Sequence, residues 1–188
     1  MKKLIVGIGG PSCSGKSFIA RMLLQQNNHF VLIHQDDYYK RQDEIPKTPD
    51  GSYEDWDCLE AFDMDKMIQD VTLLKENNEN IIMEGILIFN HPQLLSLIDI
   101  KVLLECDYEI CSARRKERSY EMINKQGIIE LFKDPEGYFD NVVWKRYMEF
   151  KESCADEEFF LLGNRDARKT LDEILKIIKN FHNKHQVL

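Results

Sequence analysis

The 188-residue sequence lacks the features of membrane-spanning, secreted and nucleic-acid-binding proteins. Its apolar runs are far shorter than the roughly 20 residues of a membrane span, and the run that begins at Leu4 is too short for a signal peptide. Basic residues are in deficit, because 33 Asp and Glu against 25 Lys and Arg give a net charge of −8. Such a charge argues against a nucleic-acid or anionic-membrane surface, so we expect phosphate binding to be local.

Cysteine and histidine are present, but without the spacing of a disulfide or metal site. The five cysteines are an odd number with no C-x-x-C pair, and the five histidines show no metal-ligand spacing. We therefore expect free thiols in a reducing cytosol, and hence a cytoplasmic protein. No repeat or low-complexity tract divides the chain, so its length predicts one domain over 1–188. The oligomeric state stays open, and a monomer is compatible with the sequence.

One stretch fits the G-x-x-x-x-G-K-[ST] phosphate loop. It consists of Gly10, Pro11, Ser12, Cys13, Ser14, Gly15, Lys16 and Ser17. The apolar run before it is typical of a buried parallel strand, and the stripe that begins at Ile19 is typical of a helix. In this context loop amides would hold phosphates, Lys16 would reach the β- and γ-phosphates, and the Ser17 hydroxyl would bind Mg²⁺. The stretch predicts a nucleoside triphosphate site rather than an incidental glycine-rich turn.

The rest of the chain alternates short apolar runs with helical spacing. Strands are expected at 30–34, 81–83, 98–105 and 159–162, and helices at 57–75 (broken near Asp63), 108–126, 138–153 and 170–183. This alternation predicts a parallel sheet with right-handed crossovers. We expect a three-layer α/β phosphate-loop NTPase fold of about five strands, with a helical lid over about 108–137. The order usual in such folds would put the second strand beside the first.

Acidic residues follow two of these strands, at the sheet edge where ligands bind in open α/β folds. Asp36 comes after the second strand, where a carboxylate could accept a proton from an acceptor hydroxyl in line with the γ-phosphate. Alternatively, Asp36 or Asp37 caps a turn. Glu84 follows the third strand and could hold a Mg²⁺-bound water, or have no catalytic role.

A basic cluster follows the fourth strand of this acidic chain. Arg114 and Arg118 share one face of the expected helix, and Arg115 lies on a neighbouring face. These residues suit a lid that brings guanidinium groups onto a transferring phosphoryl group. A solvated helix face paired with Glu109 and Glu117 is the alternative, and the pattern leaves both open.

Five further blocks complete a recognisable pattern. They are QDDYYK at 35–40, WDCLEA at 56–61, EGILIFN at 84–90, RRKERSY at 114–120 and GYFD at 137–140, followed by Trp144. With the phosphate loop they run in order over nearly the whole chain, and they are far more discriminating than the loop. Together they resemble the nicotinamide riboside kinases, a branch of the phosphate-loop nucleoside kinases akin to uridine kinases.

The resemblance implies ATP and Mg²⁺ as cofactors and a small-molecule riboside as substrate. It implies that Asp36 is the catalytic base close to Mg²⁺, and that Ser17 is a metal-binding hydroxyl. It also implies that Asp57, helped by Arg115, holds the ribose 2′- and 3′-hydroxyls. The remaining implied contacts are Arg114 and Arg118 to ATP, Gly163, Asn164 and Arg165 to the adenine, and Trp56 and Tyr120 to the pyridine ring, with Tyr38 and Tyr39 as further aromatic faces.

Two departures from the family pattern concern the substrate side. Trp56 stands where a tyrosine is usual, and Glu121–Lys133 lengthens the lid, which leaves open whether Asp134 reaches the substrate. The expected activity is ATP-dependent phosphorylation of the 5′-hydroxyl of nicotinamide riboside, and also of nicotinic acid riboside, in NAD biosynthesis. The alternatives are a uridine or other pyrimidine nucleoside kinase and a nucleotide-gated binding protein. The physiological riboside and the preference for ATP over GTP stay open.

Overall fold

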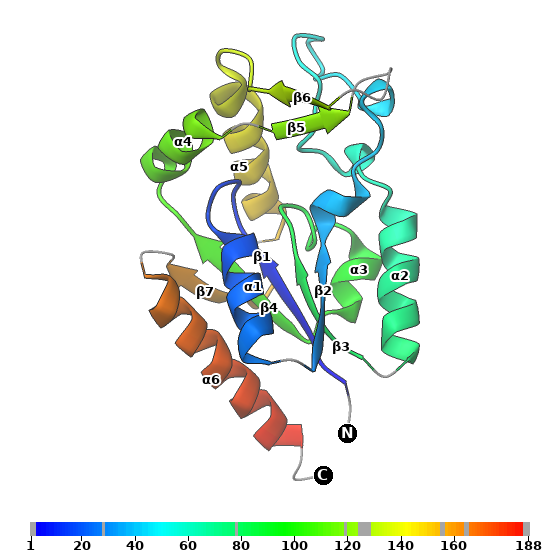
Figure 1. Cartoon of the computed structure of the whole chain (residues 1–188), viewed down its shortest axis with the longest axis vertical. Coiled ribbons are helices and arrows are strands. Elements are labelled where there is room, and N and C mark those ends of the chain that lie inside the picture. Colours follow the sequence, from blue (N-terminus) through cyan, green and yellow to red (C-terminus); the bar gives the residue numbers. More distant parts are fainter. Residues whose placement is uncertain are drawn as a thin grey trace.

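The computed structural model describes residues 3–27, 29–77, 79–118, 120–123, 129–154, 157–163 and 166–185, with the backbone alone at 120–123, 129–132 and 185. Its centre is a five-stranded parallel sheet with helices on both faces (Figure 1). The strands are β1 (Ile5–Gly9), β2 (Phe30–His34), β3 (Asn80–Glu84), β4 (Ile100–Glu105) and β7 (Phe160–Gly163). The helices are α1 (Lys16–Gln26), α2 (Met64–Glu76), α3 (Pro92–Leu97), α4 (Tyr108–Glu117), α5 (Trp144–Ser153) and α6 (Ala167–His185).

Two apolar cores, one on each face of the sheet, give the fold its three layers. Successive side chains of a strand point to opposite faces, so Ile81 and Met83 enter the core of α2, α3 and α5. Ile82 enters the other core, with α1 and α6. Strands buried on both faces read as continuous apolar runs, which is why the sequence identifies them. The predicted three-layer α/β fold of about five strands is confirmed.

The strand order is β2-β3-β1-β4-β7. The prediction that the second strand lies beside the first is therefore wrong, because β3 separates them and pairs with both. In this register Glu84 lies opposite Ile8 of β1 on one side and His34 of β2 on the other. The ends of the three strands bring the phosphate loop, Glu84 and the segment that begins at Gln35 to one edge of the sheet, the usual ligand-binding edge.

The segment after β4 differs from the prediction of one long helix. α4 ends at Glu117, and β5 (Tyr120–Ile123) then pairs antiparallel with β6 (Ile129–Phe132). The helix predicted over 108–126 is thus too long, because the residues that follow include tyrosine, isoleucine and phenylalanine, which favour strands. Figure 1 shows this strand pair at the end of the molecule where β1 and β2 finish.

The closing helix α6 is the longest, with 19 residues. Its residues Leu171, Ile174 and Ile178 follow helical spacing and are buried in the core that contains α1. Among the residues that the structure describes, no helix combines the length and the apolar character that crossing a bilayer requires.

Candidate functional site

The loop between β1 and α1 has a backbone shape suited to phosphate binding. Gly10, Cys13 and Gly15 have positive φ angles of 141°, 65° and 95°. Gly10 also has no space for a side chain, because a Cβ there would lie 2.5 Å from the Leu104 carbonyl oxygen. Backbone of this kind turns N–H groups toward a common centre, and the α1 N-terminus adds its partial positive charge. The loop therefore fits a phosphate group.

Lys16 begins α1 and is buried, with its Nζ donating to the Pro11 carbonyl oxygen at 2.9 Å. Burial lowers the pKa of Lys16, while the carboxylates of Glu84 and Asp36 oppose the shift. The ammonium group thus lies across the loop, where phosphate oxygens would be stronger acceptors than the carbonyl it now contacts.

Glu84 connects the phosphate loop to the end of β2. Its Oε1 accepts a hydrogen bond from Ser17 Oγ at 2.9 Å and lies 2.6 Å from His34 Nδ1. Because the Ser17 hydroxyl donates its proton to Glu84, its oxygen lone pairs remain available to a cation. The sequence does not predict that His34 belongs to this site, because its position opposite Glu84 depends on a strand pairing that no local pattern encodes.

Asp36 lies in a short 3₁₀ helix, Gln35–Tyr38, that follows β2. Asp36 is partly exposed to solvent. The protein atoms around its carboxyl group nevertheless displace water and so raise the pKa of Asp36. The Glu84 carboxylate adds to the rise, and Lys16 and Arg118 oppose it. Asp36, Glu84 and Lys16 therefore influence one another at the same edge of the sheet.

Gln35 anchors the segment that carries Asp36, a role that the sequence alone does not indicate. The side chain is fully buried, and its Oε1 accepts the Leu87 N–H at 2.9 Å. A Cβ at Gly85 would lie 2.4 Å from Gln35, so glycine is required for this close approach. The Gln35-Asp36 and Glu84-Gly85 segments are thereby held against each other.

The oxygen donors near the loop suit magnesium. Mg²⁺ in kinase sites is held by one or two carboxylates, waters and the phosphates of the substrate. Ser17, Asp36 and Glu84 offer such oxygens, and the Ser17–Glu84 hydrogen bond already brings two of them together. Across the part of the chain that the structure describes, no group of three or more His, Cys, Asp or Glu could hold a metal by itself. The donor set fits a cation that a nucleotide brings with it.

α4 delivers two of its arginines to the phosphate loop. Arg114 Nη1 donates to the Cys13 carbonyl oxygen at 3.0 Å. Arg115 Nη1 donates to Ser12 Oγ at 2.7 Å, and its Nε and Nη2 hold the Asp134 carboxylate at 2.6 and 3.0 Å. These contacts join the segment after β4 to the loop, and Arg115 pairs with Asp134 in the bidentate manner that arginine favours.

Asp57 is buried in the segment before α2. The Tyr138 hydroxyl donates to Asp57 Oδ2 at 3.4 Å and accepts the Trp56 N–H at 3.2 Å. Burial raises the pKa of Asp57 to about 6, Arg115 lowers it, and Asp55 adds to the rise. A carboxylate in this setting is a strong acceptor for hydroxyl groups when it is ionised.

Two of the predicted aromatic residues meet near Asp57. Tyr39 stacks on Phe62 with ring centroids 4.1 Å apart, and its ring lies 5.5 Å from that of Trp56, edge to face. Tyr38 instead turns toward α2, where its hydroxyl donates to Asp70 at 2.9 Å. The structure therefore groups Tyr39 and Trp56 and places Tyr38 apart from them.

The remaining residues of the predicted site lie in the sequence at the end of β7 and at the start of β5. Gly163 ends β7. Asn164 and Arg165 lie outside the described residues, as does the side chain of Tyr120. Their predicted roles stay predictions.

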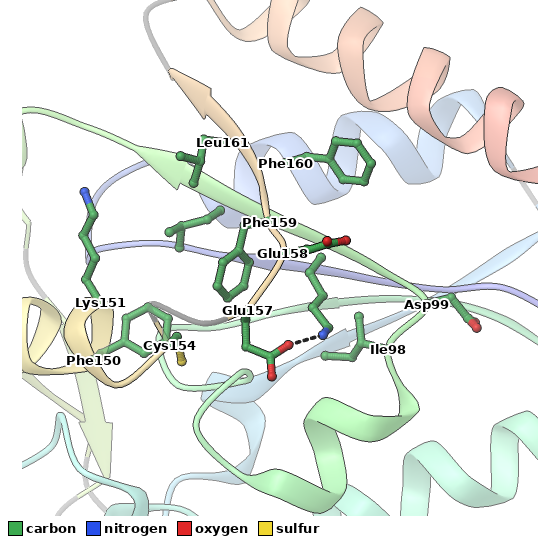
Figure 2. A pocket seen from close by; sticks show the side chains of 12 residues that line it. Ile98, Asp99, Phe150, Lys151, Cys154, Glu157, Glu158, Phe159, Phe160 and Leu161 are labelled. Atoms are coloured by element: carbon green, nitrogen blue, oxygen red, sulfur yellow. Dashed lines mark hydrogen bonds and ion pairs between the residues drawn. The ribbon is translucent and has the colours of Figure 1, made fainter.

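A separate pocket of about 790 Å³ lies between β4, β7 and the end of α5. Figure 2 shows Phe150, Cys154 and Phe159 on its wall, and Glu157 reaching an ion pair with Lys101. None of the described residues predicted to bind nucleotide or substrate lines this pocket. The candidate site is therefore the edge of the sheet at the phosphate loop.

Comparison with known proteins agrees with this geometry. A family model described as an AAA domain matches residues 6–132. Nicotinamide riboside kinase 2 of Homo sapiens is 30% identical, over 95% of this chain and 82% of that protein. Nicotinamide riboside kinase 1 of Mus musculus is 29% identical, over 95% of each chain.

The fold has known relatives among solved structures. A possible uridine kinase from Bacillus stearothermophilus matches 86% of this chain and 89% of its own, with a TM-score of 0.57. Its sequence identity is 17%, so this likeness concerns the fold alone. The sequence relatives, in contrast, match 95% of this chain at about 30% identity. The chain belongs to the nicotinamide riboside kinase family.

Proposed function

We propose that the protein transfers the γ-phosphoryl group of ATP to the 5′-hydroxyl of nicotinamide riboside, as a step of NAD biosynthesis. Nicotinic acid riboside is a second acceptor. The observation that carries the proposal is the position of Arg115, which contacts Ser12 of the phosphate loop at 2.7 Å and acts electrostatically on buried Asp57. One side chain thus connects the nucleotide side with a carboxylate suited to ribose hydroxyls. The family to which the chain belongs supports the same activity.

Each group at the sheet edge has a role in this transfer. Asp57 accepts the ribose 2′- and 3′-hydroxyls and so aims the 5′-hydroxyl at the phosphate loop. Asp36 takes the proton of that hydroxyl, and its raised pKa brings it closer to neutral pH, where a general base is most efficient. Lys16, with Arg114 and Arg118, stabilises the negative charge of the transferring phosphoryl group.

Magnesium fits beside these groups. Ser17, Asp36 and Glu84 would hold it, and bound Mg²⁺ would neutralise charge on the β- and γ-phosphates. Glu84 also keeps the Ser17 hydroxyl oriented through their 2.9 Å hydrogen bond.

The substrate panel that tests the proposal contains nicotinamide riboside, nicotinic acid riboside, uridine and cytidine, each with ATP. We expect nicotinamide riboside to exceed uridine in kcat/KM by at least about tenfold, because cation–π contact with a desolvated pyridinium contributes about 2 kcal/mol. Mass detection of the monophosphate identifies the product. Turnover of uridine above that of nicotinamide riboside would instead favour the pyrimidine nucleoside kinase, and slow ATP hydrolysis that ignores every riboside would favour a nucleotide-gated binding protein.

Trp56→Ala should lower the preference for nicotinamide riboside over uridine to within a few-fold. The change removes the Trp56 ring, an aromatic face near Asp57. Such a face binds the positively charged pyridinium of nicotinamide riboside more strongly than the neutral base of uridine. The measurement is the ratio of the two kcat/KM values. Phe160→Ala, at an exposed aromatic of the separate pocket in Figure 2, is the matched control and should leave the ratio unchanged. An unchanged ratio in Trp56→Ala would remove Trp56 from the ring-binding site.

A further inference from the structure

A second buried acid, Asp55, fixes the turn that carries Asp57. The Asp55 side chain is 2% exposed, and its Oδ1 accepts the Asp57 N–H at 3.3 Å. Its own N–H donates to the Pro46 carbonyl oxygen at 2.7 Å, and its carbonyl oxygen accepts the Cys58 thiol at 3.2 Å. The backbone on both sides of Asp57 is therefore organised by the residue two positions before it.

The charge of Asp55 is balanced from another element. Arg146 of α5 donates to Asp55 Oδ2 from Nε at 3.0 Å, and its Nη2 donates to the same oxygen. The third donor, Nη1, contacts Glu149 Oε2 at 2.9 Å on the same helix. A buried carboxylate that loses its only cationic partner leaves an uncompensated charge, which is strongly unfavourable.

We propose that Arg146 and Asp55 are a positioning pair for riboside binding, in which Arg146 neutralises Asp55 so that Asp57 stays oriented and negatively charged toward the ribose hydroxyls. The inference rests on the proposed function, in which Asp57 accepts those hydroxyls. Asp55 holds the Asp57 backbone through Oδ1 while its other oxygen is occupied by Arg146, so orientation and charge balance are supplied by one side chain.

The groups that face Asp57 come from several elements. Besides Asp55, they are Arg115 of α4, Asp134, Tyr138 and Tyr39. The pKa of Asp57 is raised to about 6, first by burial; Arg115 and the Tyr138 hydroxyl oppose the rise, and the carboxylates of Asp55 and Asp134 contribute to it. Ribose binding through an ionised Asp57 should therefore weaken as the pH falls through about 6, and removal of the Asp55 charge should move this loss to lower pH.

The first arm of the test is Asp55→Asn, which removes the charge and keeps an amide oxygen for hydrogen bonding. If the pKa of Asp57 falls by about one unit, the ionised fraction at pH 5.5 rises about threefold and is unchanged at pH 8. We expect the riboside KM of Asp55→Asn, relative to the parent protein at the same pH, to be about threefold lower at pH 5.5 and equal at pH 8. A gain of affinity confined to acid pH cannot come from a merely loosened loop.

The second arm is Arg146→Met, which leaves Asp55 without its cationic partner. We expect the riboside KM to rise about fivefold near pH 7, with the KM for ATP unchanged and kcat altered less than twofold. Asp55→Asn in the Arg146→Met background should restore the riboside KM, because the uncompensated charge is gone. Lys145→Met, at the adjacent exposed position of α5, is the matched control and should behave like the parent protein.

A third variant separates the inference from the proposed function. Asp57→Asn should raise the KM of every riboside, and a normal KM in this variant would overturn both the ribose role and the positioning pair. If Asp57→Asn is impaired while Asp55→Asn keeps the pH profile of the parent protein, the positioning pair alone is overturned. Thermal melts show which variants are folded, and Asp55→Asn remains decisive even where Arg146→Met fails to fold.

Discussion

Lys16→Ala should reduce phosphoryl transfer by at least about 10³-fold while the protein stays folded. Removal of a single preorganised charge-stabilising donor costs roughly 10²–10³-fold in other active sites, and Lys16 would bridge the β- and γ-phosphates on both sides of the bond that breaks. The ammonium lies inside the phosphate loop, 2.9 Å from the Pro11 carbonyl oxygen, where the phosphates would bind.

The fold should tolerate this change. Burial lowers the pKa of Lys16 more than Glu84 and Asp36 raise it, which means that the folded state on balance disfavours the charged form. Because the cost of burying the charge outweighs its attraction to Glu84 and Asp36, we expect a thermal melt close to that of the parent protein and weaker ATP binding. Lys75→Ala, at an exposed position near the end of α2, is the control and should keep full activity. Near-normal turnover in folded Lys16→Ala would remove the assignment of the phosphate loop.

Helix ends and tight loops could be predicted from the sequence, because neighbouring residues determine them. The break expected near Asp63 is present, since Asp63 caps α2 by accepting the Lys66 N–H at 3.0 Å and the helix begins at Met64. Aspartate is a favoured N-cap residue, and an N-cap residue does not have helical φ and ψ angles, so the helix does not continue before it. The phosphate loop was identified for the same reason, because its glycines report a backbone shape directly.

Features that depend on distant contacts could not be predicted in this way. Strand order depends on pairing between segments far apart, so the insertion of β3 between β2 and β1 carried no local signal. The same holds for Arg146, which meets Asp55 across 91 positions of sequence, and for Tyr138, which meets Asp57 across 81. Both belong to the helix expected over 138–153, and Tyr138 also to the GYFD block, but neither pattern indicates a contact with the loop that contains Asp57.

The lid shows a different kind of error. The arginines of α4 follow helical spacing, and the prediction extended that helix beyond its end at Glu117. Beyond the end of α4 the chain has an alternative to helix, because Tyr120–Ile123 pairs with Ile129–Phe132. Helix propensity is a weak preference that such pairing overrides.

Asp36→Asn should lower kcat and kcat/KM together by roughly 10²–10⁴-fold, the range typical of general-base catalysis, with a modest change in ATP binding. The two constants should fall together because proton acceptance stabilises the transition state and not the bound substrate. Asparagine keeps the size of the side chain, so the short helix Gln35–Tyr38, held by buried Gln35, should persist.

Asp37→Asn is the matched control, because Asp37 is the next residue of the same short helix and is also exposed. The two carboxylates differ in what surrounds them: the pKa of Asp36 is raised first by loss of water and then by Glu84, with Lys16 opposing. A base works only when ionised, so kcat should fall as the pH drops through the raised pKa of Asp36, and this limb should vanish in Asp36→Asn and persist in Asp37→Asn. If Asp37→Asn is crippled and Asp36→Asn keeps its turnover, Asp37 is the base, and the electrostatic coupling of Asp36 to Glu84 and Lys16 has no part in proton transfer.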